Sequence, residues 1–286
     1  MACEQPLNHV TIIGVGLLGG SIGLALRDSF PDCTTAGVGR RQASLDVALR
    51  VGAIDTATTD AAEVVGDSDL VVLCTPVGAF ARHLAAIAPH LKDHCAITDV
   101  GSTKREVVAI AEATVGHERF VGCHPMAGME KKGPRNATAD LYRDALCVLT
   151  PVEQTPRPLV ERIDAFWKLL GMRTVEMTPA AHDRAVATVS HVPHLLSSLL
   201  MSLPATADLP VAATGLRDMT RLAAGDPEMW RDIALSNRKP IVETLTRLGE
   251  DMAVLADAIT RGDADGIVDL LEKAKTRREE TFSDGA

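Results

Sequence analysis

Residues 14–19 read GVGLLG, directly after the apolar run HVTII of residues 9–13 and before a helical pattern. In such a G-x-G-x-x-G turn, Gly14 allows the tight bend, Gly16 lets the backbone approach a pyrophosphate, and Gly19 permits close packing of helix on strand. The N-terminus of the helix that follows the turn offers free N–H groups and a favourable dipole to an anion, and Leu17 and Leu18 of the turn are expected cofactor contacts. The turn therefore predicts a dinucleotide-binding strand–turn–helix unit, with a glycine-rich turn that binds nothing as the alternative.

Short apolar runs alternate with helix-like segments through the first half of the chain. Each run is continuously apolar, which is typical of strands buried on both faces of a parallel sheet. The alternation predicts an α/β domain with a doubly wound, Rossmann-type sheet. The expected strands are 9–14, 35–38, 70–75, 96–100, 120–123, 146–150 and finally 171–177, and the expected helices include 21–28, 43–51, 77–91 and 103–113.

Strand patterns end near residue 177, and from Pro179 onward the chain is typical of successive helices. Breaks are expected at 204–210, 225–227 and 262–266, and Pro240 marks a kink or a helix start in the amphipathic stretch 233–259. We therefore predict two domains: residues 1–177 form the cofactor-binding Rossmann domain, and residues 178–286 form an all-helical domain for substrate binding and dimerisation.

Composition excludes several classes of protein. A formal net charge of −9 argues against a nucleic-acid partner, whose binding face would be basic. We expect no membrane partner, because no apolar run reaches the roughly 18 residues of a membrane span. The six cysteines are scattered without a C-x-x-C pair, so we expect no metal and a reduced, cytoplasmic protein.

The end of the second predicted strand bears on the choice of cofactor. Residues 38–41 read VGRR, with no acidic side chain to bind the ribose 2′-hydroxyl. Arg40 and Arg41 suit a 2′-phosphate, which a guanidinium can bind bidentately. We expect NADP to be preferred and NAD to be possible, unless these are two solvated arginines at a helix start. Thr75 and Pro76, at the end of the third predicted strand, complete the expected cofactor contacts.

Two further segments follow strand ends, where ligands bind in such sheets. The sequence DVGSTK at 99–104 contains Ser102, and GCHPMAGME at 122–130 contains His124 and Glu130. A histidine taken at random is more often structural, but the strand end and the flanking Pro125 favour a catalytic role for His124.

The helical half contains His191 and His194, three residues apart and so on one face of a helix. A metal site would need a third ligand that the neighbourhood does not supply, and a capping or core histidine pair is the structural alternative. Residues 215–221 read GLRDMTR, in which Arg221 can bind a carboxylate or form a surface salt bridge.

Together these segments resemble a known family. HPMAG-x-E, SH-x-PH, G-x-RD-x-TR-x-A and DP-x-MW-x-DI, in this order behind the glycine motif, are similar to the prephenate/arogenate dehydrogenase (TyrA) family of tyrosine biosynthesis. The resemblance implies oxidative decarboxylation of a cyclohexadienol with NAD(P)⁺. Prephenate would give 4-hydroxyphenylpyruvate, arogenate would give tyrosine, and a dual-specificity cyclohexadienyl dehydrogenase would take both.

The resemblance also implies the roles of the site residues. His124 would accept the proton of the ring hydroxyl, with a pKa near the reference value of about 6.5. Ser102 would orient His124 or the substrate oxygen, and Arg221 would pair with a substrate carboxylate. The remaining residues would fix the substrate (His191 and His194), lie at the mouth of the site (Glu130), or brace the Arg221 segment (Asp218 and Trp230).

Two alternatives remain open. A β-hydroxyacid-type dehydrogenase would rely on a lysine base, but residues 176–238 contain no lysine. A non-catalytic dinucleotide-binding protein would not need His124, Ser102 and Arg221 together. We also expect a homodimer, because helical segments such as LLSSLLMSL at 195–203 carry more apolar surface than a small helical domain buries.

Overall fold

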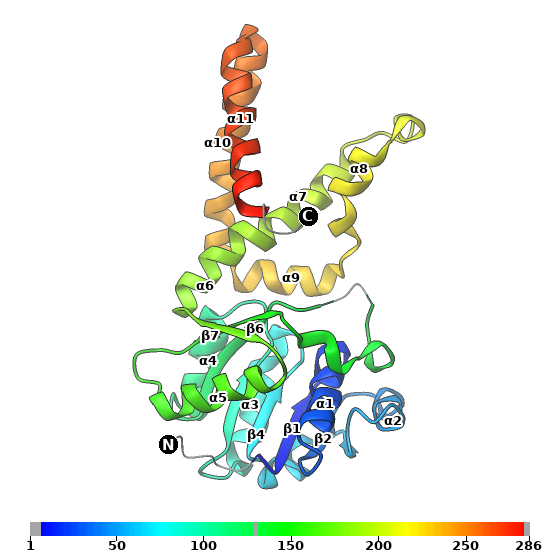
Figure 1. The fold of residues 1–286 in the computed structure, drawn as a ribbon, viewed down its shortest axis with the longest axis vertical. Helices are drawn as coiled ribbons and strands as arrows, with labels where there is room; N and C mark the ends of the chain where they lie inside the picture. Colours follow the sequence, from blue (N-terminus) through cyan, green and yellow to red (C-terminus); the bar gives the residue numbers. More distant parts are fainter. Residues whose placement is uncertain (1–6, 129–130, 283–286) are drawn as a thin grey trace. The chain divides into compact units, whose positions relative to one another are not determined.

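The structure is a computed structural model that describes residues 7–128 and 131–282. Within these residues eight strands form one sheet in the order β3-β2-β1-β4-β5-β6-β7-β8 (Figure 1). The strands are β1 His9–Ile13, β2 Thr34–Val38, β3 Thr56–Thr58, β4 Leu70–Leu73, β5 Ala96–Asp99, β6 Phe120–Pro125, β7 Leu146–Thr150 and β8 Arg173–Glu176. The predicted Rossmann-type sheet is confirmed.

Strand direction differs from the prediction at one place. Strands β1 to β6 pair in parallel, but β7 runs antiparallel to β6, with His124 opposite Val148. The parallel pairing typical of such apolar runs therefore does not extend to this pair. Both strands are buried on both faces, and a continuously apolar run carries no information on direction.

Helices cover both faces of the sheet. One apolar core lies beneath α1 (Leu17–Ser29), α2 (Gln42–Arg50) and α5 (Arg157–Leu169), and the other beneath α3 (Phe80–Ile87) and α4 (Arg105–Val115). Side chains of β4 alternate between these cores, because successive residues of a strand point to opposite faces. Double burial explains why the strands are recognisable as unbroken apolar runs.

The helices after the sheet follow the predicted breaks. They are α6 Pro179–Val186, a π-helical turn η7 Ala187–His191, α7 Val192–Ser202, α8 Thr214–Met219, the 3₁₀ turn η9 Arg221–Ala224, α9 Pro227–Ser236, α10 Arg238–Arg261 and α11 Ala264–Phe282. Pro240 lies in the first turn of α10, where its missing N–H costs nothing, so it marks a helix start and not a kink. The described residues up to Arg238 form one compact unit, and those from Lys239 form a second.

The second unit contains most of α10 and all of α11. Many of its large apolar side chains are exposed, among them Met252, Val254, Ile259 and Leu271 at 57–64%. Gly262 has a φ of +66° between the two helices, a left-handed conformation that glycine adopts without strain. No helix in the described part of the chain is long and apolar enough to cross a membrane.

Candidate active site

The glycine turn has the packing that its motif predicts. Gly14 has a φ of +103°, and a Cβ on Gly19 would lie 2.3 Å from the carbonyl oxygen of Gly14, so neither position accepts a larger residue. A Cβ on Gly16 would meet no atom within 4 Å. Gly16 thus faces open space at the start of α1, where Leu17 and Leu18 begin the helix. The turn leaves room for a ligand at the helix N-terminus.

The residues after β4 add a polar group that a ligand could contact. The hydroxyl of Thr75 is buried and has no hydrogen-bond partner among the described residues. Pro76 follows it and precedes the short turn η3 (Val77–Ala79). A buried hydroxyl without a partner costs free energy unless a ligand or water satisfies it. The open space at Gly16 and this hydroxyl both fit a bound dinucleotide.

The arginines after β2 lie at the surface. Arg40 and Arg41 are exposed, and Arg41 precedes the first residue of α2. Burial lowers the pKa of His83 on α3, and the nearby charges of Arg82 and Arg40 lower it further. Arg40 therefore lies close to Arg82 and His83 of α3, and these side chains form a basic cluster. No sequence motif identified its two members on α3.

His124 lies at the carboxyl end of β6 and is only 9% exposed. Burial holds its pKa well below the ordinary value of 6.5, and His182, Lys104 and His191 lower it further. The expected pKa near 6.5 is therefore wrong, because it took no account of desolvation. The imidazole is neutral at pH 7 and can accept a proton.

A chain of hydrogen bonds leads from His124 to a buried carboxylate. His124 Nδ1 lies 2.9 Å from His182 Nε2, and His182 Nδ1 lies 2.8 Å from Asp183 Oδ1. The carboxylate also accepts the backbone N–H groups of Lys104 at Oδ1 (2.8 Å) and Arg105 at Oδ2 (2.9 Å). Thr178 caps α6 by accepting the N–H of Ala181, which sets the helix start that carries His182 and Asp183.

The loop that carries Ser102 is held from both ends. Lys104 and Asp99 form an ion pair in which neither side chain is exposed. Asp99 also accepts the backbone N–H groups of Gly101 (2.7 Å) and Cys123 (2.9 Å). These contacts connect the Ser102 loop to β6 immediately before His124, so the two predicted residues are positioned by one buried network.

His191, His194 and Trp230 come together. The rings of His194 and Trp230 are stacked at 3.5 Å between centroids, and His191 meets Trp230 edge to face at 6.0 Å. Both histidines are buried, and the backbone of Ser102 lies beside the ring of His191. Trp230 therefore braces the two histidines, and its expected role in bracing the Arg221 segment stays a prediction.

Asn237 sets the tautomer of His191. Its Nδ2 donates to the backbone carbonyl of Asp183 (2.8 Å) and lies 3.1 Å from His191 Nδ1, so this nitrogen accepts and Nε2 carries the proton. The Nε2 atom is buried without a hydrogen-bond partner among the described residues. A donor in this state is available to a polar ligand group.

Two other predicted residues lie on the short helical elements that follow α7. Arg221 begins η9, which packs against α7, and it is exposed. Asp218 is exposed on α8. Glu130 lies outside the described residues.

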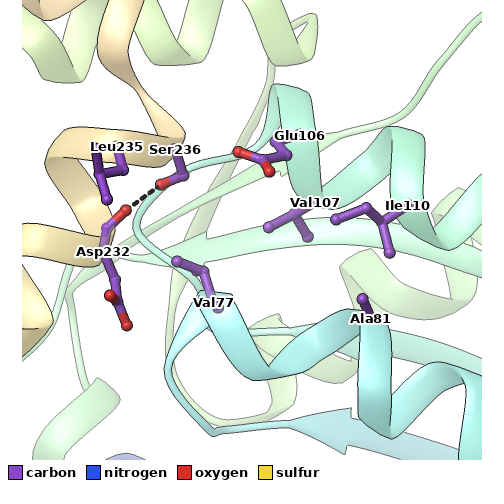
Figure 2. A pocket seen from close by; sticks show the side chains of 9 residues that line it. Val77, Ala81, Glu106, Val107, Ile110, Asp232, Leu235 and Ser236 are labelled. Atoms are coloured by element: carbon purple, nitrogen blue, oxygen red, sulfur yellow. Dashed lines mark hydrogen bonds between the residues drawn. The ribbon is translucent and has the colours of Figure 1, made fainter.

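A pocket of about 310 Å³ lies between the start of α3, α4 and α9 (Figure 2). Its wall includes Val77, Ile110 and Leu235, with Glu106 and Asp232 as charged groups. None of the predicted site residues lines it. Ser236 connects it to the Ser102 loop, because its hydroxyl lies 3.0 Å from that of Thr103.

Comparison with known families covers most of the chain. The family described as "Prephenate dehydrogenase, nucleotide-binding domain" matches residues 22–176, and "Prephenate dehydrogenase, dimerization domain" matches residues 178–273. The chain belongs to the prephenate dehydrogenase family. It is thus a nicotinamide-dependent oxidoreductase.

Individual members of the prephenate dehydrogenase family are similar over nearly the whole of this chain. A cyclohexadienyl dehydrogenase of Zymomonas mobilis is 32% identical over 277 residues, which are 94% of each protein. The prephenate dehydrogenase of Bacillus subtilis is 32% identical over 284 residues, 96% of this chain and 76% of that protein. The crystal structure of prephenate dehydrogenase from A. aeolicus with hydroxyphenyl propionate and NAD⁺ has a TM-score of 0.91 and 30% identity, covering 97% of this chain and 99% of that one.

Sequence motifs did not identify His182, Asp183 and Asn237 as site residues. The only local signal was a histidine next to an aspartate just after a Thr-Pro helix start. Their contacts with His124, Lys104 and His191 span 46–79 residues of sequence. No short motif contains such pairs.

Proposed function

We propose that this protein converts prephenate to 4-hydroxyphenylpyruvate, with His124 as the proton acceptor and NADP⁺ as the preferred cofactor. The observation that carries the proposal is a buried, neutral histidine at a strand end, connected to a carboxylate through His182, in a chain of the prephenate dehydrogenase family.

The chemistry needs a base at the ring hydroxyl. The substrate carries a hydroxyl at C4 and a carboxylate at C1 of the same ring. The bound nicotinamide supplies the acceptor for the C4 hydrogen as hydride. Loss of CO₂ makes the ring aromatic and supplies the driving force, so the protein must position the substrate and take the hydroxyl proton.

His124 suits that proton transfer. Its Nδ1 is engaged with His182, so Nε2 is the ring atom that accepts the hydroxyl proton. Its lowered pKa keeps it neutral through the physiological range. Positioned proton acceptors of this kind contribute roughly 10²- to 10⁴-fold to a rate.

The other predicted residues would bind substrate and cofactor. His191 offers its unpartnered Nε2–H, His194 is held in place by Trp230, and Arg221 would pair with a substrate carboxylate. Ser102 would orient the reacting oxygen. We propose Glu130 at the mouth of this site and Asp218 as a brace of the Arg221 segment.

The cofactor would bind along the edge of the sheet formed by the strand ends. We propose that the glycine turn with Leu17 and Leu18 holds the pyrophosphate, and that Thr75 and Pro76 contact the nicotinamide half. Arg40 and Arg41 would hold the 2′-phosphate of NADP⁺. The charges gathered around His83 support this preference, because they add to the attraction for an anion.

We further propose a cytoplasmic homodimer. Residues 1–177 would bind the cofactor, and residues 178–286 would bind substrate and the second subunit. Leu199, Leu203 and Met252 are apolar residues with 58–76% of their surface exposed. Their exposure supports the proposal that a second subunit covers this surface. The five described cysteines are free thiols, which agrees with a reducing compartment.

Arogenate is the second candidate substrate, because a relative over the whole chain is named a cyclohexadienyl dehydrogenase. The test is a steady-state assay of the purified protein with prephenate and with arogenate, each with NAD⁺ and NADP⁺. We expect the highest kcat/KM with prephenate and NADP⁺. Turnover of arogenate alone would overturn the substrate assignment, and turnover of neither would overturn the function.

A further inference from the structure

We propose that His182 and Asp183 are positioning residues that hold His124 in the tautomer with its proton on Nδ1. This inference rests on the proposed role of His124, and it adds two residues that no motif of the chain singled out.

The carboxylate of Asp183 fixes the first donor. Both of its oxygens accept backbone N–H groups, those of Lys104 and Arg105, so the carboxylate acts as an acceptor on both sides. His182 Nδ1 lies 2.8 Å from the oxygen that Lys104 N–H also approaches. His182 Nδ1 must therefore carry a proton and donate it to this contact.

The direction of the second hydrogen bond follows from the first. A neutral imidazole has one protonated nitrogen and one acceptor nitrogen. In its neutral form, with the proton on Nδ1, His182 can only accept at Nε2, which lies 2.9 Å from His124 Nδ1. His124 must then donate from Nδ1, and its Nε2 keeps the lone pair that takes the hydroxyl proton.

Burial of the three side chains disfavours the opposite tautomer of His124. His182 and Asp183 are at most 1% exposed, and His124 is 9% exposed. Water cannot readily replace the lost partner of a group at such depth, so the opposite tautomer would leave two lone pairs or two protons facing each other. The rings also meet edge to face at 5.1 Å between centroids, which restricts their rotation.

The first experiment measures the tautomers directly and needs no substrate. The full-length protein is labelled with ¹⁵N in its histidine rings, and the His124 and His182 signals are assigned from their absence in His124→Asn and His182→Gln. We expect both rings to be protonated at Nδ1 and unprotonated at Nε2 at pH 7. A proton on Nε2 of either ring would overturn the proposal, because His182 would then donate to His124 Nδ1 or His124 would lack the lone pair that accepts the hydroxyl proton.

The second experiment uses a matched pair of variants. His182→Gln offers an amide oxygen in the place of Nε2, whereas His182→Leu has a similar volume and no acceptor. We expect His182→Leu to lower kcat by roughly 10- to 100-fold, within the range of a proton-transfer contribution, with little change in KM. His182→Gln should retain most of kcat and keep the His124 proton on Nδ1.

The two experiments separate this proposal from the proposed function. Equal kcat in both variants, with an unchanged His124 tautomer, would show that His182 is only structural. Absence of prephenate turnover in the wild type would instead refute the function and leave the tautomer measurement valid. If His182→Leu does not fold, the wild-type ring signals still decide the proposal.

Discussion

The proposed catalytic residues and the arginines after β2 differ in their access to water. His124, His182 and Asp183 are buried and linked by hydrogen bonds of 2.8–2.9 Å. Arg40 and Arg41 are exposed. Buried hydrogen bonds act at low dielectric, and packing restricts the positions of their donors and acceptors. Exposed charges are instead screened by water and salt. The difference indicates that the chemical step depends on a few contacts with large effects, and cofactor preference on several weak ones.

The largest effect is expected from His124→Asn. Removal of the proton acceptor should lower kcat by roughly 10²- to 10⁴-fold and leave cofactor affinity unchanged. Steady-state kinetics and a cofactor titration measure the two effects. His117→Asn, at an exposed histidine between α4 and β6, is the matched control and should behave as wild type. Wild-type kcat in His124→Asn would contradict the assignment.

The pH profile of kcat is a second test of the role of His124. Because the pKa of His124 is lowered well below 6.5, its neutral form persists as pH falls through that value. We expect kcat to stay level from pH 8 to 6.5 and to fall only at lower pH. A midpoint at or above 6.5 would mean that the ring is not desolvated during turnover.

Arg221→Ala tests the proposed carboxylate contact. A hydrogen bond to a charged group contributes about 1.5–3 kcal/mol, so we expect KM for prephenate to rise roughly 10- to 150-fold. Lysine should restore part of the affinity, since it lacks the planar fork. Arg217→Ala, at an exposed arginine of α8, is the control. An unchanged KM in Arg221→Ala would place Arg221 outside the site.

Lowering the pH should reduce the free energy of unfolding through the buried histidine cluster. The exposed arginines should not contribute to this loss. Burial lowers the pKa of His191 from 6.5 to about 4. The unfolded chain then binds the extra proton as pH falls through 6.5, so stability is lost between pH 6.5 and 4. At pH 5 this one residue should cost about 2 kcal/mol of unfolding free energy.

Denaturant unfolding of wild type and His191→Asn at pH 7.5 and pH 5 measures this cost. Asparagine offers an oxygen to Asn237 and does not titrate. We expect the loss between the two pH values to be about 2 kcal/mol smaller in the variant. Equal losses would show that His191 titrates normally in the folded protein.

The smallest effect is expected from the surface arginines. The double variant Gly39→Asp with Arg40→Ser should shift the ratio of kcat/KM towards NAD⁺ by about 10-fold, since exposed ion contacts are partly screened. A Cβ at position 39 would lie 3.1 Å from Leu45 Cδ2, a contact that a small side-chain shift relieves. Arg50→Ser, on the last turn of α2, is the control.

Salt should distinguish the two cofactors in the wild type. NADP⁺ binding should weaken more than NAD⁺ binding as ionic strength rises, because the discriminating charges are exposed. If NAD⁺ has equal or higher efficiency at low salt, Arg40 and Arg41 do not contact the cofactor.

Much of the fold could be predicted because its signals are local. A run such as LVVL at 70–73 is apolar at every position, and the sheet buries it on both faces. The glycine turn is local too, since the φ of Gly14 and the close approach of Gly19 act within a few residues. The edge strand β3 was missed because three residues, Thr56–Thr58, carry no apolar run.

The direction of β7 and the partners of His124 depended on tertiary structure. An apolar run is the same read forwards or backwards, so burial alone does not orient a strand. The motif around residue 124 marks a reactive histidine, but its tautomer and lowered pKa come from His182 and Asp183, 58 and 59 positions away. Periodicity identifies which side chains are buried. Only the packing of α6 on the sheet decides which buried groups share a proton, because hydrogen bonds depend on distances that the chain order does not contain.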